Sequence, residues 1–269
     1  MGSGRVRVEI AGHVAEVVLS RPDKHNALDG AMFEGILAAA REVAAAPGVR
    51  AVVLHGEGKS FCAGLDVAAL GTGLKIDDIL ERAPGQRANA AQRVCTDWID
   101  LPVPVIAALH GNVLGGGLQI ALGADVRIAA ADARLSIMES RWGLVPDMGI
   151  TATLPRLVAI DVAKELTYTA RVIAGEEAAR LGLVSRIAAD PLGAARALAA
   201  EIAGRSPDAV RSAKRLLDTA WHAPVEEGLV LETELQRELI GSANQVAAVT
   251  AGMTGQAPEF VDPGPVAAG

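Results

Sequence analysis

The sequence predicts an α/β fold with strands concentrated in its first half and helices in its second half. Short apolar or alternating segments interleave with helical ones up to about residue 150, and helical periodicity dominates from there on. Of the 269 residues, 51% are hydrophobic but only 3% are aromatic, so the core must consist mainly of Ala, Val, Leu and Ile. We expect a strand-bearing core over residues 1–200 and a helical region over residues 201–269.

In the first half, strand patterns alternate with helix patterns. The stretch RVRVEIAGHVAEVVL predicts a hairpin, because polar and apolar residues alternate on both sides of AGH. Asp29 is placed to cap the first long helix, and Pro102 and Pro104 end the second. We expect strands over residues 5–10, 14–19, 49–56, 105–111, 125–130 and 135–138, and helices over residues 30–46, 79–100 and 116–123.

From residue 150 onward, apolar residues recur with the helical period, and Gly and Pro breaks separate the segments. LVSRIA at residues 183–188 has a strand pattern instead. The tail GQAPEFVDPGPVAAG is rich in Pro and Gly and is expected to fray. We expect helices over residues 150–169, 176–181, 191–204, 207–221 and 224–241.

Charge and cysteine content exclude several classes of partner. The net charge of −7 disfavours nucleic acid and anionic membranes as main partners. Two cysteines, Cys62 and Cys95, provide no disulfide framework and suit a reducing compartment. No apolar run reaches the ~20 residues that span a bilayer, and MGSGRVRVEI carries charges where a signal peptide needs an apolar run. We therefore expect a cytoplasmic protein that binds neither nucleic acid nor membrane.

Two glycine motifs that bind nucleotide phosphates fail on spacing. GEGKS at residues 56–60 resembles the end of a phosphate-binding loop, but that motif needs a Gly where Val53 stands. Gly115 and Gly117 would need a third Gly at the position of Ile120. The five histidines lack the spacing of metal ligands and no GxSxG elbow occurs, so we expect no metal site and no serine nucleophile.

Residues that can carry chemistry gather in three loops, each of which follows a predicted strand. SFCAGLD (60–66) and HGNVLGGGLQ (110–119) have Gly where a helix starts, and MESRWGLVPDMG (138–149) carries Glu139 and Asp147. Ligands of open α/β sheets bind beyond the carboxyl ends of the strands. Unpaired N–H groups from two helix starts can converge on one oxygen as an oxyanion hole, and glycine lets a substrate carbonyl approach the main chain.

Six motifs in order make the chain resemble the crotonase, or enoyl-CoA hydratase/isomerase, superfamily. They are RPDKHNAL, FCAGLD, HGNVLGGGL, ADVRIAAADARLSIME, GLVPDMG and GEEAARLGLV, and the resemblance covers roughly residues 5–240. It implies a crotonase-like spiral of ββα turns, with an acyl-CoA site in residues 1–200 and a helical trimerisation region in residues 201–269. It also implies a homotrimer or a dimer of trimers.

The resemblance further implies acyl-CoA thioester chemistry, in which coenzyme A enters as part of the substrate and no separate cofactor is needed. The oxyanion hole falls on the backbone N–H groups of Leu65 and Gly116, which would hold the thioester oxygen of an enolate. The loop DKHNAL is similar to the segment that lines the coenzyme A arm, where Lys24 could meet a phosphate. The substrate-binding positions that the resemblance implies are Lys24, Ala27, Leu28, Ala63, Gly64, Asp66 and Gly115.

Three polar residues are the candidates for catalysis. Glu139 matches one of the two glutamates with which hydratases of the superfamily hold and activate water. The other position is Gln119, whose amide cannot accept a proton at neutral pH. Dienoyl-CoA isomerases carry an acid that matches Asp147, but they also carry one at the position of Gln119. The chain therefore departs from both patterns.

Structural roles for the same residues stay open at this stage. Gln119 is either an amide that bonds loop backbone or a group that faces the substrate. Asp147 is either a second proton carrier or the N-cap of the next helix. Glu139 is the main acid/base candidate, and its structural alternative is an ion pair with Arg134 or Arg141.

The leading hypothesis is an enzyme that stabilises a thioester enolate and moves protons with Glu139 and Asp147, as an enoyl- or dienoyl-CoA isomerase does. One alternative is a 2-enoyl-CoA hydratase that uses Glu139 while Gln119 positions the water. The second alternative is a non-catalytic protein that binds acyl-CoA.

Overall fold

The computed structural model describes residues 4–69 and 76–262 and contains two sheets. The larger has six strands in the order β1-β2-β3-β4-β6-β9, and the smaller has three in the order β5-β7-β8. β1 runs antiparallel to β2, and the remaining pairs of the larger sheet are parallel. The strands of the larger sheet are Val6–Ala11, Val14–Leu19, Ala51–Gly56, Val105–Leu109, Val126–Ala129 and Arg186–Ile187, and those of the smaller are Asn112–Leu114, Arg134–Ser136 and Ile173–Ala174.

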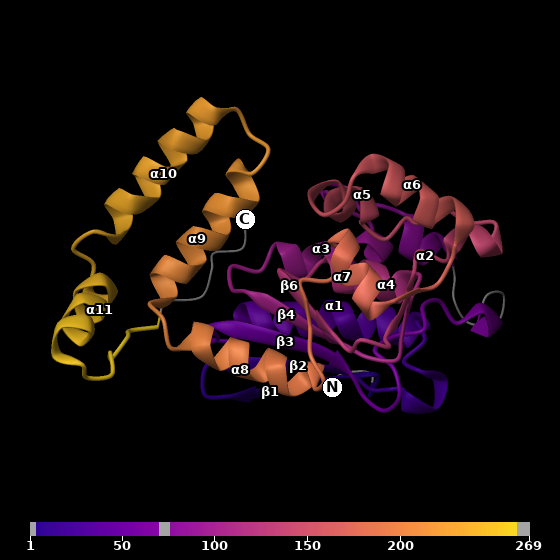
Figure 1. Ribbon diagram of the computed structural model, residues 1–269, viewed down its shortest axis with the longest axis horizontal. Helices are drawn as coiled ribbons and strands as arrows, with labels where there is room; N and C mark the ends of the chain where they lie inside the picture. Colours follow the sequence, from indigo (N-terminus) through magenta and orange to yellow (C-terminus); the bar gives the residue numbers. More distant parts are fainter. Residues whose placement is uncertain (1–3, 70–75, 263–269) are drawn as a thin grey trace.

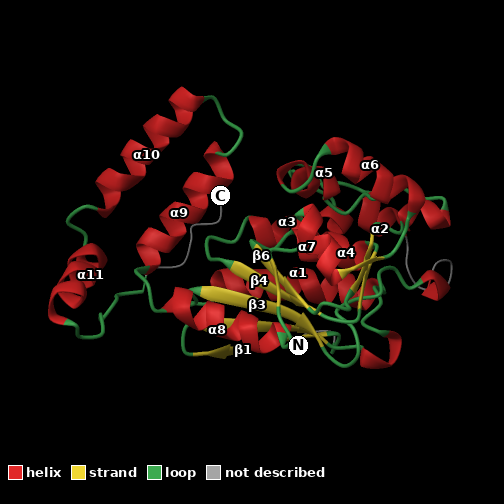
Figure 2. Ribbon diagram, in the orientation of Figure 1, coloured by secondary structure: helices red, strands yellow, loops and turns green. Residues whose placement is uncertain are grey.

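Helices cover both faces of the larger sheet (Figures 1 and 2). Because side chains alternate across a strand, β3 and β4 contribute to two separate apolar clusters. Val52 and Leu54 belong to the main core, whereas Ala51 and Val53 pack on the other face. The main core receives α1 (Gly30–Ala45) and α3 (Ala90–Ile99), and the opposite face is covered by α8 (Pro191–Ala203).

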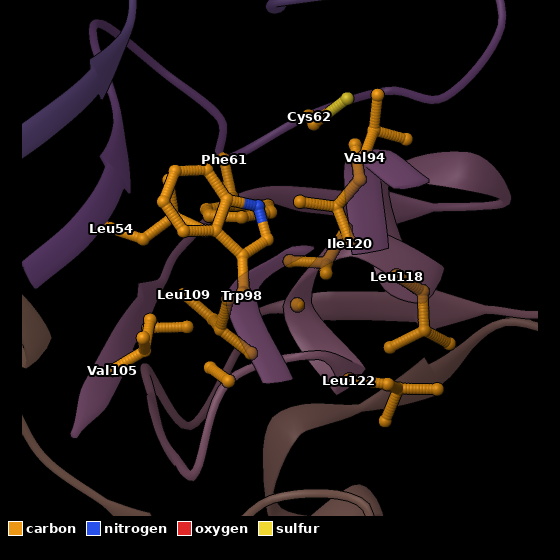
Figure 3. Packing of buried hydrophobic residues seen from close by; sticks show 14 of the residues in the cluster. Leu54, Phe61, Cys62, Val94, Trp98, Val105, Leu109, Leu118, Ile120 and Leu122 are labelled. Atoms are coloured by element: carbon orange, nitrogen blue, oxygen red, sulfur yellow. The ribbon is translucent and has the colours of Figure 1, made fainter. Parts of the chain in front are cut away.

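The main core is built around a few large side chains near the start of α4 (Gly116–Leu122). Trp98 of α3 lies among Leu54, Phe61 and Leu109 in Figure 3. These four side chains are fully buried, and α4 is buried along its whole length. The scarcity of aromatics thus leaves a core of mostly aliphatic residues, in which Trp98, Phe61 and Phe33 are the buried aromatic side chains of the described chain.

Four short 3-10 helices and seven further α-helices complete the described part of the chain. The short 3-10 helices are η1 (Pro22–Lys24), η2 (Val67–Ala69), η3 (Glu139–Trp142) and η4 (Leu154–Arg156). The other α-helices are α2 (Ile76–Leu80), α5 (Ile150–Thr153), α6 (Ile160–Thr169), α7 (Gly175–Leu181), α9 (Pro207–Ala220), α10 (Val225–Leu239) and α11 (Ala243–Thr254). Figure 1 shows α9, α10 and α11 as an arm that projects from the body.

A buried lysine anchors this arm to the body. The Lys214 ammonium on α9 donates to Asp125 Oδ2 at 2.7 Å and to the carbonyl oxygen of Val103 at 3.1 Å. Asp125 Oδ2 also accepts the backbone N–H of Val105, the first residue of β4. The charge on Lys214 is therefore paired and hydrogen-bonded, which is the condition for burying it.

The described part of the tail is also attached, which corrects the expectation that residues 255–269 fray. The Arg50 guanidinium lies 2.6 Å from Asp262 Oδ1 and its centre is 5.9 Å from the centroid of the Phe260 ring. The Val261 N–H donates to Asn244 Oδ1 on α11. The composition of the tail could not reveal these partners, because Arg50 is remote from the tail in sequence. Residues 263–269 lie outside the described part of the chain.

The predicted α/β class is confirmed, and most predicted elements are present, but four details differ. The helix expected over residues 79–100 is divided into α2 and α3, because Asn89 starts a new helix with a capping box to Gln92. The helix expected over residues 150–169 is divided at η4, whose first turn contains a proline. The short strands β5 and β8 and the helix α11 were not predicted. β5 and β8 are only three and two residues long and are not part of a longer apolar or alternating segment that would predict a strand.

The close approach of α4 to the loop after β3 yields a stability prediction. A Cβ at position 117 would lie 2.5 Å from the carbonyl oxygen of Cys62, so Gly117→Ala must push α4 away from that loop. We expect it to lower the free energy of unfolding by about 1–3 kcal/mol, measured by urea denaturation. Gly252→Ala in α11, where no heavy atom lies within 4 Å of an added Cβ, is the matched control and should stabilise by up to about 1 kcal/mol. Equal effects of the two substitutions would contradict the packing argument.

Candidate active site

Leu65 and Gly116 both present backbone N–H groups that their own elements do not use. Leu65 forms a parallel bridge with Leu28, in which Gly64 O accepts from Leu28 N–H and Asp66 N–H donates to Leu28 O. In a parallel ladder this leaves the N–H of Leu65 itself on the opposite edge. Gly116 is the first residue of α4, and a helix has no internal acceptor for its first N–H groups.

The two loops that carry these N–H groups are in direct contact. Cys62 bridges to Val113, since its N–H donates to Asn112 O and its carbonyl oxygen accepts from Leu114 N–H. Gly64 has a φ of +85°, and a Cβ there would lie 2.6 Å from Leu114 O and 3.5 Å from Gly116 N. Only glycine fits this conformation and this approach. The structure therefore brings together the loops that the sequence predicted to form the site.

Glu139 lies beside the start of α4, at the beginning of η3 after β7. It is 9% exposed, and its Oε1 accepts a hydrogen bond of 2.7 Å from Gln119 Nε2. A Cβ at Gly115 would lie only 3.2 Å from Oε1, so the carboxyl borders the residue that precedes Gly116. The second carboxyl oxygen, Oε2, is buried and has no hydrogen-bond partner in the described residues.

Burial controls the electrostatics of this carboxyl. Desolvation raises the pKa of Glu139 above its ordinary value, and the negative charge of Asp147 raises it further, against opposing hydrogen bonds from backbone N–H groups and from Gln119. A raised pKa makes the ionised carboxyl a stronger proton acceptor than an ordinary glutamate. The ion pair with Arg134 or Arg141 is not present: within residues 4–69 and 76–262, Glu139 forms no salt bridge.

Asp147 lies in the segment that follows η3, and its side chain is exposed at the surface. Partial burial still raises the pKa of Asp147 by desolvation. The alternative role as an N-cap is wrong, because α5 begins at Ile150 after Gly149, whose φ is +88°, and no side chain caps it. Asp147 therefore does not cap α5, and its negative charge raises the pKa of Glu139.

Gln119 bonds loop backbone, as one of its two expected roles requires, and also contacts Glu139. Its side chain is fully buried on α4. The amide oxygen accepts the N–H of Met148 at 2.8 Å while the amide nitrogen donates to Glu139. The expectation that the amide also faces the substrate stays a prediction.

The segment expected to line the coenzyme A arm is held by a residue that the sequence reasoning missed. Asn26 is fully buried in the left-handed region at a φ of +55°. Its amide nitrogen donates to the carbonyl oxygens of Ser60 and Phe61 at 2.8 and 3.2 Å, and its Oδ1 accepts from Arg21 N–H. The available signal was the residue type: Asn tolerates positive φ better than most residues, so an Asn in a loop is a candidate for that conformation.

The predicted substrate-binding residues occupy the same region. Lys24 ends η1 and is exposed, while Ala27 and Leu28 are buried; a Cβ at Gly116 would lie 2.8 Å from Leu28 Cδ1. Ala63 N–H donates to His25 O, which ties the two loops together. Asp66 forms an ion pair of 2.8 Å with Arg21, so its carboxylate stabilises the loop.

In the described part of the chain, no group of three or more His, Cys, Asp or Glu side chains could hold a metal ion. No described helix combines the length and the apolar character that a membrane span requires.

Comparison with known proteins identifies relatives over almost the whole chain. Residues 9–261 match the sequence model of the family described as enoyl-CoA hydratase/isomerase. The short-chain-enoyl-CoA hydratase of Clostridium acetobutylicum is 34% identical over 254 residues, which cover 93% of this chain and 95% of that protein. The mitochondrial Δ(3,5)-Δ(2,4)-dienoyl-CoA isomerase of Rattus norvegicus is 32% identical over 255 residues, which cover 90% of this chain and 76% of that protein.

A solved structure agrees with these matches. The enoyl-CoA hydratase of Bacillus anthracis superposes with a TM-score of 0.86 at 30% identity, covering 95% of this chain and 98% of that one. The expected crotonase-like fold and the resemblance to the superfamily are confirmed.

The raised pKa of Glu139 predicts a pH-dependent stability difference. A carboxyl whose pKa is raised on folding stabilises the fold below its ordinary pKa of about 4.3, and this contribution is lost as the pH rises through the folded-state pKa. Glu139→Gln should therefore be more stable than the parent at pH 8, and the difference should shrink toward zero below about pH 4, as followed by urea unfolding. Glu42→Gln, at an exposed position on α1, controls for the loss of one charge. A difference for Glu139→Gln that does not vary with pH would refute the assignment.

Proposed function

The chain belongs to the enoyl-CoA hydratase/isomerase family, and we propose that it is an enoyl- or dienoyl-CoA isomerase that moves protons with Glu139 and Asp147. The observation that carries the proposal is Glu139 Oε2, which is buried beside the glycine start of α4 and has no hydrogen-bond partner among residues 4–69 and 76–262. Such an oxygen is available to a substrate, and desolvation raises the pKa of its carboxyl. The approach of Gly64 to Gly116 supports an adjoining oxyanion hole.

In the proposed mechanism, the thioester oxygen accepts hydrogen bonds from the N–H groups of Leu65 and Gly116. Glu139 Oε2 removes a proton from the carbon α to the thioester carbonyl; the C–H electron pair moves into the enolate, and negative charge gathers on the oxygen. Each preorganised donor is worth about 3 kcal/mol to such an oxyanion. Over a short allylic distance, Glu139 returns the same proton to a different carbon. Over a longer conjugated system, a protonated Asp147 donates its own proton to the distant carbon. Glu139 then releases the proton it took, and Asp147 takes one up through solvent, which restores both groups. Protons and electrons balance without a further reactant.

Coenzyme A enters this reaction as part of the substrate, and the proposal needs no separate cofactor. Lys24, which is exposed, would meet a phosphate of coenzyme A in this proposal. The buried loop at Ala27 and Leu28, with Ala63 to Asp66 and Gly115 beside it, would border the thioester arm. Both cysteines are unpaired, which supports the proposed cytoplasmic location.

Hydration is the second candidate, since a relative at 34% identity is named as a hydratase. In that reaction Glu139 would activate the water, and Gln119 could contribute only its remaining N–H, because its oxygen is already bonded to Met148 N–H. A single carboxyl would have to act as both base and acid. The unpartnered Oε2 and the second acid at Asp147 favour proton transfer over this alternative and over a non-catalytic acyl-CoA-binding role.

We further propose that the chain forms a homotrimer, alone or paired into a dimer of trimers. The contacts would come from the helical region of residues 201–269, which includes the arm formed by α9, α10 and α11. Large apolar side chains on α9, α10 and α11 and in the turns between them are exposed, among them Trp221, Leu229, Val230, Ile240 and Met253. A monomer rarely exposes so many large apolar groups on one element, and such surfaces mark interfaces.

The catalytic assignment predicts distinct effects of three substitutions. Glu139→Gln should lower kcat on 3-enoyl- or 3,5-dienoyl-CoA by roughly 10²- to 10⁴-fold, because it removes the group that transfers the proton. Asp147→Asn should lower the rate on the 3,5-dienoyl substrate more than on the 3-enoyl one, whereas Glu42→Gln should leave both rates unchanged. Mass spectrometry should find products of unchanged mass. Gain of one water would support the hydratase, and absence of any turnover with measurable acyl-CoA binding would support the non-catalytic alternative.

The proposed assembly predicts that the oligomer dissociates when negative charges are introduced on the apolar surface of α10. Leu229→Asp combined with Val230→Asp on α10 should convert a trimer or hexamer into smaller species, measured by sedimentation velocity. Glu234→Gln, an exposed position on the same helix, should leave the assembly intact. A parent protein that sediments as a monomer at micromolar concentration would exclude the proposed assembly.

A further inference from the structure

The amide of Gln119 has its orientation dictated by a backbone group. Met148 N–H can only donate, so the Gln119 oxygen must face it, at 2.8 Å. The amide nitrogen must then face Glu139 Oε1, at 2.7 Å. The direction of both hydrogen bonds, from Met148 N–H to Gln119 and from Gln119 to Glu139, is therefore fixed by the covalent structure. Glu139 Oε1 is an acceptor in either protonation state of the carboxyl.

This fixed polarity leaves only one atom of Glu139 to carry a proton. Oε1 is occupied by the N–H of Gln119 and is bordered by Gly115, whereas Oε2 is buried without a partner in the described residues. We propose that Gln119 is a positioning residue that holds Glu139 Oε1 as a permanent acceptor and so makes Oε2 the atom that takes up and returns the substrate proton. The catalytic meaning of this inference rests on the proposed isomerase, whereas the arrangement of hydrogen bonds does not.

The same amide also joins the acid to the oxyanion side of the site. Gln119 binds the backbone of Met148, and the Met148 side chain packs on Gly116, where an added Cβ would lie 2.6 Å from Sδ. Asp147 precedes Met148 directly, so the segment that carries the second acid is held by the bond that orients the first. Gln119 thus places Glu139, Asp147 and the Gly116 N–H relative to one another.

The charged surroundings of Glu139 are simple enough for a pH test. The negative charge of Asp147, from the segment after η3, raises the pKa of Glu139. α4 contributes only the neutral Gln119, and α5 between Ile150 and Thr153 carries no ionisable side chain. The backbone N–H groups of Met138 and Glu139 complete the polar contacts. A titration measured at Glu139 therefore reports on Gln119 and Asp147.

The substitution Gln119→Glu separates positioning from packing. When the introduced carboxyl is protonated it reproduces the amide, because its carbonyl accepts from Met148 N–H and its O–H donates to Glu139 Oε1. When it is ionised, two negative oxygens would lie about 2.7 Å apart, at the distance now spanned by the hydrogen bond, so the pair should keep one proton to unusually high pH. The ratio of variant kcat to parent kcat should be near one at acidic pH and fall at least tenfold as that proton is lost.

Asn244 on α11 provides a matched control. Its Oδ1 accepts the N–H of Val261 and its Nδ2 donates to Asp208 Oδ2 at 2.7 Å, so it bridges a backbone N–H to a carboxylate as Gln119 does, but outside the candidate site. Asn244→Asp should alter stability and leave the ratio of kcat values independent of pH. A Gln119→Glu ratio that is equally independent of pH would overturn the inference.

A measurement without substrate keeps this test separate from that of the proposed function. In protein with ¹³C-labelled glutamate carboxyls, the Glu139 signal is assigned by its loss in Glu139→Gln. Gln119→Met removes the N–H donor at similar volume and should raise the pKa of Glu139, while Asn244→Asp should leave it in place. In the parent, the side-chain amide signal of Gln119 should follow the same titration, which needs no variant to fold. If the pKa of Glu139 is unchanged in Gln119→Met, the positioning role is refuted even if the protein turns over enoyl-CoA. If the pKa changes as expected but no enoyl-CoA is turned over, only the proposed isomerase function is refuted.

Discussion

The contact between the first turn of α4 and the loop after β3 is the constraint on which the site depends. Gly117 faces the carbonyl oxygen of Cys62 at a distance that leaves no room for a side chain, and Gly64 faces the carbonyl oxygen of Leu114 in the same way. Two backbones meet directly, with the Cys62–Val113 bridge between them. Because no side chain intervenes, the N–H groups of Leu65 and Gly116 are positioned by main-chain geometry alone. A site built from backbone donors needs this rigidity, since their contribution depends on their being oriented before the charge develops.

The same burial that makes the site rigid also determines the character of its acid. α4 is buried over its whole length, so any polar group that it carries must be bonded within the protein. Gln119 satisfies this condition with two partners. Glu139, which is buried beside α4, has a hydrogen-bond partner in the described residues for only one of its two carboxyl oxygens. The remaining oxygen is costly to the folded state, and desolvation accordingly raises the pKa of the carboxyl. Local instability of this kind is a common property of functional groups, which are held in place by the surrounding structure.

The fold could be predicted from the sequence to the extent that it follows local patterns. The hairpin, α1 and the buried strands β3 and β4 have clear periodicity, and their predicted bounds agree with the structure to within two residues. The division of residues 79–100 and the docking of the tail on Arg50 depend on caps and on partners far along the chain, which periodicity does not contain. For the site, the glycine run and the two acids could be recognised from residue types and order. The role of Asn26 could not, because it donates to backbone carbonyl oxygens of another loop.

An amide at position 119 suits a reaction whose intermediate is an anion. The site already holds the carboxyls of Glu139 and Asp147, and each raises the energy of further negative charge in its vicinity. A third carboxylate on α4 would lie against Glu139 and oppose the enolate of the proposed reaction, unless it kept a proton of its own. Gln119 provides the same two hydrogen bonds without that charge, and its orientation is set by a backbone N–H that cannot reverse. An amide in place of an acid therefore removes one group that could carry a proton and, at the same time, fixes the orientation of Glu139 without adding a charge.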